Sequence, residues 1–264
     1  NNIQNYGLDT ELLLAKALRN NREKILINLN KKIEIKFLNK FIKLISRRKK
    51  NEPIAYILQK KEFWKNIFFI NKDVLIPRPE TELVIEEILK FVDISHSKTF
   101  LDVGTGSGNI TISLIKERLN LRATAIDIST KAIKIAKFNA KMHHLENKIN
   151  FLNIDIDKFN YNKYDFIVSN PPYIKEANLK NLEDNVRLFE PHIALRAGID
   201  GFREIKKIIK KSRTLLKKNG KLIIEIGKNQ DRLTRYLLTK NGYHINKIRE
   251  DFNSIPRVIV STIL

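Results

Sequence analysis

The sequence predicts an α/β protein with a largely parallel sheet, preceded by a small helical domain. From residue 99 onward, short apolar runs of strand character alternate with segments whose apolar residues recur at helical spacing. Residues 12–45 show the helical period alone. The last two strand-like runs, 244–248 and 258–264, have no helix between them. We therefore expect them to pair antiparallel and to complete the sheet with an antiparallel C-terminal strand.

The composition excludes several classes of protein. No apolar run is long enough to span a membrane and no signal pattern is visible, so we expect a soluble, cytoplasmic protein without a membrane partner. The absence of cysteine excludes disulfides, thiolate metal sites and cysteine nucleophiles, and the five histidines lack metal-ligand spacing. We expect no metal. The first residue is Asn1 and not Met, which is consistent with a processed or trimmed amino terminus.

The formal net charge of +21 has two interpretations. It is typical of proteins with an acidic partner such as nucleic acid. However, the excess is mostly Lys, spread along the chain beside abundant Asn and Ile, and no basic patch is interleaved with aromatic residues. This distribution favours a compositional bias over a dedicated nucleic-acid surface.

The N-terminal part is predicted to contain helices and a hairpin. Asp9-Thr10-Glu11 is expected to cap a helix over 12–18, and the helical period continues to about Ile45. We assign residues 1–60 to a helical domain. Two short strand-like runs between Glu62 and Ile76 predict a β-hairpin connector over 61–78. Pro79 then begins a helix that reaches Phe91 and opens the main domain, 79–264.

The remaining elements of the main domain follow from the same alternation of patterns. Strands are predicted over 99–103, 122–126, 149–154, 164–169 and 221–226, and helices over 110–116, 131–142, 202–216 and 232–240. The long segment 174–201 has weak periodicity. Because it directly follows a candidate catalytic corner, we expect it to cover or shape the substrate entrance.

A glycine loop follows the first strand of the main domain. It comprises Gly104, Thr105, Gly106, Ser107 and Gly108. Glycine at alternate positions permits positive φ and lets the backbone approach a ligand closely. The loop is of nucleotide-binding type, although a nicotinamide fingerprint would have glycine at position 109 and a phosphate-binding P-loop would carry Lys-Ser/Thr. A plain strand-to-helix turn is the alternative.

Acidic residues follow the next two strands. Asp127 ends the second strand, where an acid accepts hydrogen bonds from ribose hydroxyls. Asp155 and Ile156 follow the third, and we expect the acid beside the adenine amino group and Ile156 on the adenine face. The loop and Asp127 together favour a nucleoside site over a plain turn. Since the ends of parallel strands share one edge, Gly106, Asp127, Asp155 and Asn170 should converge on a single crevice.

The fourth strand of the main domain ends in the corner Asn170-Pro171-Pro172-Tyr173. The prolines have no N–H to donate, so the strand stops and nearby carbonyls stay open. The Asn170 side-chain oxygen and the Pro171 carbonyl could accept both N–H bonds of an amide or exocyclic amine, with Tyr173 as a flat wall. Such a corner suits methylation of nitrogen, whereas an ordinary Asn-Pro turn is the alternative.

With these motifs, the chain resembles the class I S-adenosylmethionine-dependent methyltransferases, whose sheet is Rossmann-like. It most closely resembles the family that methylates a glutamine side-chain nitrogen in bacterial peptide-chain release factors. The resemblance runs nearly end to end and is carried by residues 9–15, 52–56, 62–64, 75–82, 104–108, 170–173, 186–187, 189–191, 194–195 and 200–201. The glycine loop is common to many methyltransferases, but segment 77–82 together with the Asn-Pro-Pro-Tyr corner is much narrower.

The resemblance implies a protein-glutamine N5-methyltransferase of translation termination. Its cofactor would be S-adenosyl-L-methionine, bound by Gly104 to Gly108 and Asp127. Asn170 would contact both donor and substrate, and Pro171, Pro172 and Tyr173 would hold the glutamine of a Gly-Gly-Gln motif. Transfer would be direct, without a metal or covalent intermediate, and direct nucleic-acid binding is not required. The N-terminal domain would recognise the release factor. The family often has an aromatic residue where Ile156 stands, so stacking on adenine should be weaker here.

Three alternative functions share parts of this pattern. A ribosomal-protein glutamine methyltransferase differs only in the protein that accepts the methyl group. An adenine-N6 methyltransferase of nucleic acid uses a similar corner and suits the basic charge, but no additional target-recognition domain is evident in the sequence. A non-catalytic module that binds nucleoside or RNA would be expected to have lost the corner.

Overall fold

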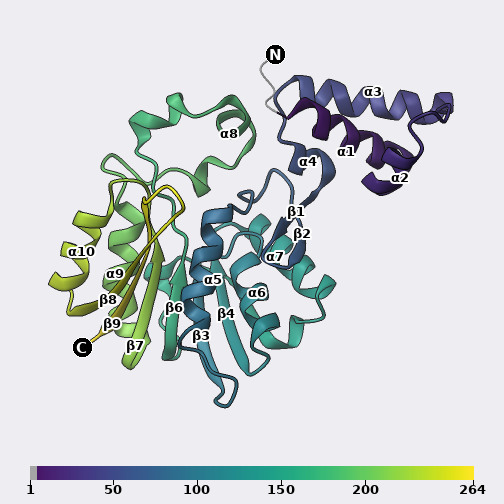
Figure 1. Ribbon diagram of the computed structural model, residues 1–264. Helices are drawn as coiled ribbons and strands as arrows, with labels where there is room; N and C mark the ends of the chain where they lie inside the picture. The colour runs from purple at the N-terminus through teal and green to yellow at the C-terminus, as the bar shows by residue number, and fades with distance from the viewer. Residues whose placement is uncertain (1–4) are drawn as a thin grey trace.

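The computed structural model describes residues 5–264 of the chain (Figure 1). The α-helices are α1 (Tyr6–Leu18), α2 (Arg22–Ile27), α3 (Ile35–Lys49), α4 (Ile54–Leu58), α5 (Glu82–Leu89), α6 (Asn109–Glu117), α7 (Thr130–Met142), α8 (Asp184–Phe189), α9 (Arg203–Leu215) and α10 (Asp231–Lys240). The strands are β1 (Lys60–Phe63), β2 (Asn66–Phe69), β3 (Lys98–Val103), β4 (Leu121–Asp127), β5 (Ile149–Asn153), β6 (Tyr164–Ser169), β7 (Leu216–Glu225), β8 (Tyr243–Glu250) and β9 (Pro256–Ile263). Short 3-10 helices are η1 (Pro79–Thr81), η2 (Glu146–Lys148), η3 (Ile156–Lys158), η4 (Glu176–Asn181) and η5 (His192–Ala194). Within residues 5–264, no helix is long and apolar enough to cross a membrane.

The N-terminal helices have a small core of their own. Leu13 and Ala17 of α1, Leu44 of α3 and Ile57 of α4 are buried together. Helix α1 begins at Tyr6, so the prediction that Asp9 caps a later start was wrong. Asp9 instead lies in the first turn, where a carboxylate is favourable, and pairs with Arg48 Nε at 2.6 Å. Figure 1 shows α1, α2 and α3 set apart from the sheet, joined to it through α4 and the hairpin.

The hairpin between helices and sheet is formed as the sequence predicts. Strands β1 and β2 pair antiparallel, with Lys60 opposite Phe69 and Phe63 opposite Asn66. Phe63 and Phe68 are buried and join the core of the main sheet. The hairpin thus packs against the sheet domain.

The main sheet has seven strands in the order β5-β4-β3-β6-β7-β9-β8. The pairs β4/β5, β3/β4, β3/β6 and β6/β7 are parallel, and β9 is antiparallel to both β7 and β8. The predicted mostly parallel sheet with an antiparallel C-terminal strand is therefore confirmed. Strand β3 is central, with β4 on one side and β6 on the other. The strand order therefore reverses at β3, and a crevice forms there at the carboxyl ends of the strands.

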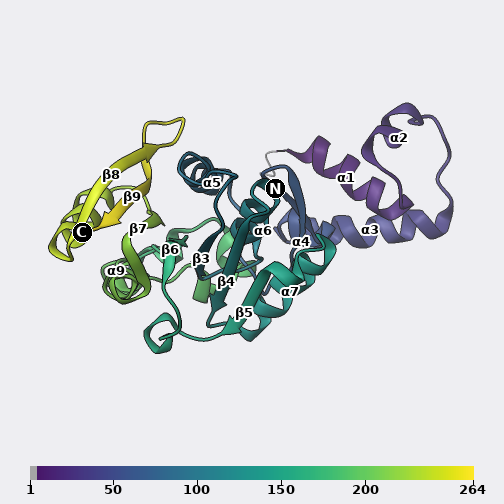
Figure 2. The same ribbon diagram turned by 90° about the horizontal axis from the view of Figure 1, so that it is seen from below.

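Helices cover both faces of the sheet, as Figure 2 shows from below. Alternate strand residues point to opposite faces: Phe100 packs with buried residues of α5, α6 and α7, whereas Leu101 packs with residues of α9 and α10. Phe100 and Phe166 stack with ring centroids 4.8 Å apart across the β3/β6 pair. This alternation buries the parallel strands on both faces and leaves only their ends free for a site.

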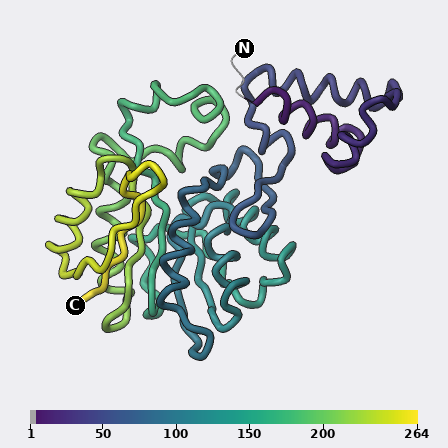
Figure 3. Tube along the Cα trace, viewed as in Figure 1, coloured from purple at the N-terminus to yellow at the C-terminus, as the bar shows by residue number. Residues whose placement is uncertain are grey.

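The segment between β6 and α9 leaves the carboxyl ends of the strands as a separate excursion (Figure 3). It contains η4, α8 and η5, and an isolated bridge between Ile174 and Arg196 closes its base. In Figures 1 and 3 this segment and the N-terminal helices both lie beyond the same end of the sheet. Segment 174–201 is therefore placed beside any ligand bound at the strand ends.

Asn139 of α7 joins the hairpin to the glycine loop. Its side chain is fully buried, and its Oδ1 accepts from Phe69 N at 2.8 Å. Its Nδ2 donates to Phe69 O at 2.9 Å and to Ser107 O at 2.8 Å. One side chain thus satisfies three backbone groups from two distant segments.

Replacing Asn139 with alanine should destabilise the protein strongly. The change leaves three backbone groups without partners, and each such group costs about 1–3 kcal/mol when it is buried. We expect the free energy of unfolding in urea to fall by at least about 2 kcal/mol. Asn150→Ala, on the exposed side of β5, is the matched control and should change it by less than about 0.5 kcal/mol. Equal stabilities for the two variants would contradict this role.

Candidate functional site

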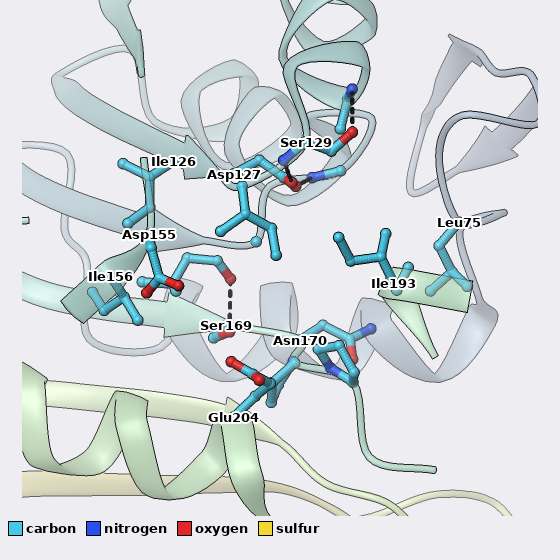
Figure 4. Close-up of a pocket in the computed structure, with 18 of the residues that line it drawn as sticks. Leu75, Ile126, Asp127, Ser129, Asp155, Ile156, Ser169, Asn170, Ile193 and Glu204 are labelled. Atoms are coloured by element: carbon cyan, nitrogen blue, oxygen red, sulfur yellow. Dashed lines mark hydrogen bonds between the residues drawn. The ribbon is translucent and has the colours of Figure 1, made fainter. Parts of the chain in front are cut away.

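A cavity lies at the carboxyl ends of the parallel strands (Figure 4). Its walls come from the ends of β3, β4, β5 and β6, the start of α9, and two loops from elsewhere in the chain. Gly106, Asp127, Asp155 and Asn170 all line it. The convergence expected from the strand-end rule is therefore present.

Two glycines of the loop after β3 form one wall of the cavity. Gly104 and Gly106 have φ of 75° and 55°, a region that side chains rarely adopt. A Cβ added at either position would meet no atom within 4 Å, so the space beside the backbone is open. The loop leaves room for a ligand to lie directly against the main chain.

The other three residues of the loop do not line the cavity and instead support its shape. The Thr105 hydroxyl donates to Asp102 Oδ2 at 2.7 Å. The Ser107 carbonyl accepts from Asn139. A Cβ at Gly108 would lie 3.1 Å from Ile112 Cδ1, so this glycine permits close packing of α6. In this geometry these three residues would serve donor binding by supporting the loop and not by contacting the donor.

Asp102 is a buried carboxyl beneath the glycine loop. Its Oδ2 accepts from the hydroxyls of Thr105 and Thr111, and its Oδ1 has no hydrogen-bond partner among residues 5–264. Burial raises the pKa of Asp102 to about 6, against the opposing effect of the two hydroxyls. The loop is therefore built on a buried carboxyl whose pKa lies above that of an ordinary aspartate.

Asp127 lies at the end of β4 with its carboxylate at the cavity wall. Its Oδ2 accepts from Gly106 N at 3.0 Å and its Oδ1 from Ser129 N at 2.8 Å. Burial raises the pKa of Asp127, and the two backbone N–H donors counteract this shift. Each oxygen has accepting capacity left, so the group is suited to a vicinal diol.

Asp155 and Ile156 form the wall that follows β5. Asp155 Oδ1 accepts from Asp157 N at 2.9 Å and so caps η3, while its Oδ2 lies 3.5 Å from Lys207 Nζ. Ile156 is buried and contributes apolar surface. The pair offers an apolar plane with a carboxylate at its edge, which is the arrangement predicted for a purine.

The corner after β6 faces this wall across the cavity. Asn170, Pro171 and Pro172 line it, but Tyr173 does not. The Tyr173 ring lies against Gly227, where an added Cβ would come 2.9 Å from Tyr173 Cδ2. Gln230 Nε2 donates to Tyr173 O at 3.3 Å and to Gly201 O at 2.8 Å. Burial raises the pKa of Tyr173 to about 12, so the phenol is neutral at physiological pH.

The amide of Asn170 is oriented by its neighbour in η1. Nδ2 donates to Thr81 Oγ1 at 3.0 Å. Among residues 5–264, no donor bonds to the Asn170 Oδ1 or to the Pro171 carbonyl. Both oxygens are therefore available to a ligand with two N–H bonds.

The sequence did not identify several residues of this site. Pro191, Ile193 and Ala194 of segment 174–201, and Arg203, Glu204 and Ile208 of α9, also line the cavity. The expectation that segment 174–201 shapes the entrance agrees with this placement. Glu190 holds the segment down, since it pairs with Arg78 and accepts from Ile76 N at 3.2 Å. In the sequence, the weak periodicity of segment 174–201 was the signal that pointed to its place at the site.

The residues present fit S-adenosylmethionine. The open cradle at Gly104 and Gly106, the accepting carboxylate of Asp127 and the apolar face of Ile156 all line the cavity. Together they offer space against the main chain, acceptors for a ribose diol and an apolar surface for adenine. Among residues 5–264, no group of three or more His, Asp or Glu side chains could hold a metal ion.

Asp127→Asn should weaken S-adenosylmethionine binding in calorimetry. The amide keeps the size of the side chain but replaces one accepting oxygen with a donor that opposes Gly106 N–H or Ser129 N–H. Loss of a charged hydrogen bond costs about 1.5–3 kcal/mol, which corresponds to roughly 10–100-fold in Kd. Asp157→Asn, a carboxylate of the same region outside the cavity, is the matched control. Unchanged affinity in Asp127→Asn would remove Asp127 from the donor site.

Comparisons with known proteins agree with this site. Residues 94–259 match the description "Methyltransferase domain" and residues 1–58 match "PrmC N-terminal domain". A release factor glutamine methyltransferase of Clostridium acetobutylicum is 35% identical over 98% of this chain and 92% of its own length. A bifunctional methyltransferase of Rickettsia typhi is 38% identical, but the chain spans only 52% of that protein.

A solved structure supports the fold alone. The crystal structure of a methyltransferase from Pyrococcus furiosus has a TM-score of 0.56 at 14% identity, covering 85% of this chain and 98% of that one. The match to a methyltransferase domain agrees with the predicted fold and with S-adenosylmethionine as the predicted cofactor. On the full-length similarity to the Clostridium protein, the chain belongs to the release factor glutamine methyltransferase family.

Proposed function

We propose that the protein methylates the side-chain nitrogen, N5, of the glutamine in the Gly-Gly-Gln motif of peptide-chain release factors, using S-adenosylmethionine. The observation that carries this proposal is the state of Asn170. Its Nδ2 is engaged with Thr81, so its Oδ1 is left open beside the Pro171 carbonyl and the donor cavity. A primary amide, with two N–H bonds on one nitrogen, matches these two acceptors.

The residues of the corner act by binding and orientation. S-adenosylmethionine, when bound, supplies a methyl group whose bond pair stays on sulfur as the new nitrogen–carbon bond forms. Asn170 Oδ1 and Pro171 O hold the amide nitrogen in line with that group, and one amide proton leaves to solvent after transfer. Positioning of this kind can lower a barrier by up to about 7–11 kcal/mol. No general base of the chain is required beside the corner.

The N-terminal helices are proposed to recognise the release factor. We assign residues 1–60 to recognition, 61–78 to the hairpin connector and 79–264 to catalysis. Ile27, Leu29 and Ile35, in and around α2 and at the start of α3, are exposed and apolar, which suits a protein-docking surface. Direct binding of nucleic acid or membrane plays no part in this scheme. Because release factors act on ribosomes, the enzyme would act in the cytoplasm.

Methyl transfer from labelled S-adenosylmethionine to purified release factor tests the substrate. We expect label on the intact factor and none on a variant in which the Gly-Gly-Gln glutamine is replaced. Ribosomal protein and DNA are assayed in parallel, since a near relative or an adenine methyltransferase would label those. Label on either of them, with none on the release factor, would refute the proposed substrate while leaving the donor site in place.

Asn170→Ala should reduce turnover while donor binding largely survives. The variant removes one preorganised acceptor for the amide, a loss that typically costs on the order of 10²-fold or more in kcat. Calorimetric titration with S-adenosylmethionine separates binding from turnover. Asn178→Ala, an exposed residue of η4 outside the cavity, is the control. Wild-type turnover in Asn170→Ala would refute the role of this side chain.

A further inference from the structure

Glu225 is a buried acid at the edge of the catalytic corner. It is the last residue of β7 and only 2% exposed. Ser169 of β6 pairs with Ile224 of β7, so the next residues along the two parallel strands are Asn170 and Glu225. Its Oε2 has no hydrogen-bond partner among residues 5–264. A buried carboxyl oxygen without a hydrogen-bond partner is energetically unfavourable. Its position beside Asn170 therefore indicates a functional role.

Five groups surround this carboxyl. Thr81 of η1 and Asn170 lower its pKa by hydrogen bonding, and Arg257 of β9 lowers it by charge. Glu80 raises it, and Tyr173 lies close enough for its own pKa to be raised by Glu225. Burial outweighs the lowering effects and raises the pKa of Glu225 to about 7. The group can therefore change its charge near neutral pH.

An ionised Glu225 limits how the Asn170 amide can be turned. A carboxylate can only accept, so Asn170 can face it only with Nδ2, the nitrogen that also donates to Thr81 Oγ1 at 3.0 Å. The other polar atom of that amide, Oδ1, is thereby directed away from Glu225. A protonated Glu225 is itself a donor and permits the opposite orientation, in which Oδ1 faces it.

We propose that Glu225 is a positioning residue which, together with Thr81, holds the Asn170 side chain with its oxygen toward the substrate amide. This inference rests on the proposed function, because that function assigns the Asn170 oxygen to the glutamine N–H. Glu225 does not touch the substrate. It removes the alternative orientation, in which Nδ2 would face the substrate nitrogen and repel its hydrogens.

The buried Glu225 carboxyl makes the folded protein less stable as pH rises. A carboxyl whose pKa is higher in the folded state binds more protons there than in the unfolded chain between the two pKa values. The free energy of unfolding therefore falls as pH rises from the ordinary glutamic acid range to about 7. A residue kept only for structure would not be expected to carry this penalty, whereas a residue kept for positioning can.

The test uses the full chain with paired substitutions. Glu225→Gln keeps the shape but loses the obligatory acceptor, and Thr81→Ser retains the hydroxyl that accepts from Asn170 Nδ2. Glu87→Gln is the matched control, because Glu87 is also a nearly buried carboxyl but pairs with Lys90 and Lys247 away from the cavity.

The first measurement is the pH titration of the Asn170 side-chain amide signals by NMR. In wild type and Thr81→Ser we expect these signals to titrate with an apparent pKa near 7. In Glu225→Gln the titration should be lost, and in Glu87→Gln it should persist. This readout does not depend on any methyl acceptor, so Asn170 signals that titrate as wild type in Glu225→Gln would overturn the positioning role.

The second measurement is kcat for release factor against pH. Wild-type kcat should fall as pH drops through the Glu225 pKa, since protonation frees the amide. Glu225→Gln should lose this acidic limb and reduce kcat about tenfold, the lower range for loss of a group that orients a ligand. Its Kd for S-adenosylmethionine should change little, and its Tm above the Glu225 pKa should not fall. Wild-type kcat with the limb intact in Glu225→Gln would overturn the inference, whereas absence of transfer by the wild-type enzyme would refute the proposed substrate instead.

Discussion

The parallel pairing of β3 with both β4 and β6 is the constraint on which the site depends. It brings the ends of strands that are far apart in sequence to one edge of the sheet. The glycine loop and Asn170 follow directly after β3 and β6, and Asp127 is the last residue of β4. The residues of the site thus lie where the strands end.

The fold and the first layer of the site were readable from sequence because both depend on short-range pattern. Strand and helix periods located the elements, and the strand-end rule gathered Gly106, Asp127, Asp155 and Asn170. The prediction was less successful where contacts between distant parts of the chain set the ends of an element. Helix α1 starts at Tyr6, and Asp9 in its first turn pairs with Arg48 instead of capping it. Strand β7 starts at Leu216, which pairs with Tyr164. Neither partner is visible from local spacing.

Supporting residues were harder to foresee than contacting ones. The strand-end rule applied to β7 would have marked Glu225, but nothing in the sequence shows that Thr81 approaches it. Likewise Ile193 reaches the cavity from a segment without regular period, and Glu204 reaches it from the first turn of α9. Two buried acids, Asp102 and Glu225, flank the site, and one oxygen of each has no hydrogen-bond partner in the part of the chain that the structure describes. Such groups are expensive in a core, and their concentration here sets the site apart from the apolar packing around it.

Asn139 has a consequence for the order in which the protein folds. Its hydrogen bonds join residues that are 70 and 32 positions apart in the chain. Contacts of this separation carry a large loop-closure cost and form late relative to local helices and neighbouring strands. Because one side chain bonds to both segments, we expect the glycine loop to reach its final shape together with the docking of the hairpin on α7. Affinity for the methyl donor should accordingly be among the last properties to appear during refolding, after most of the secondary structure is already in place.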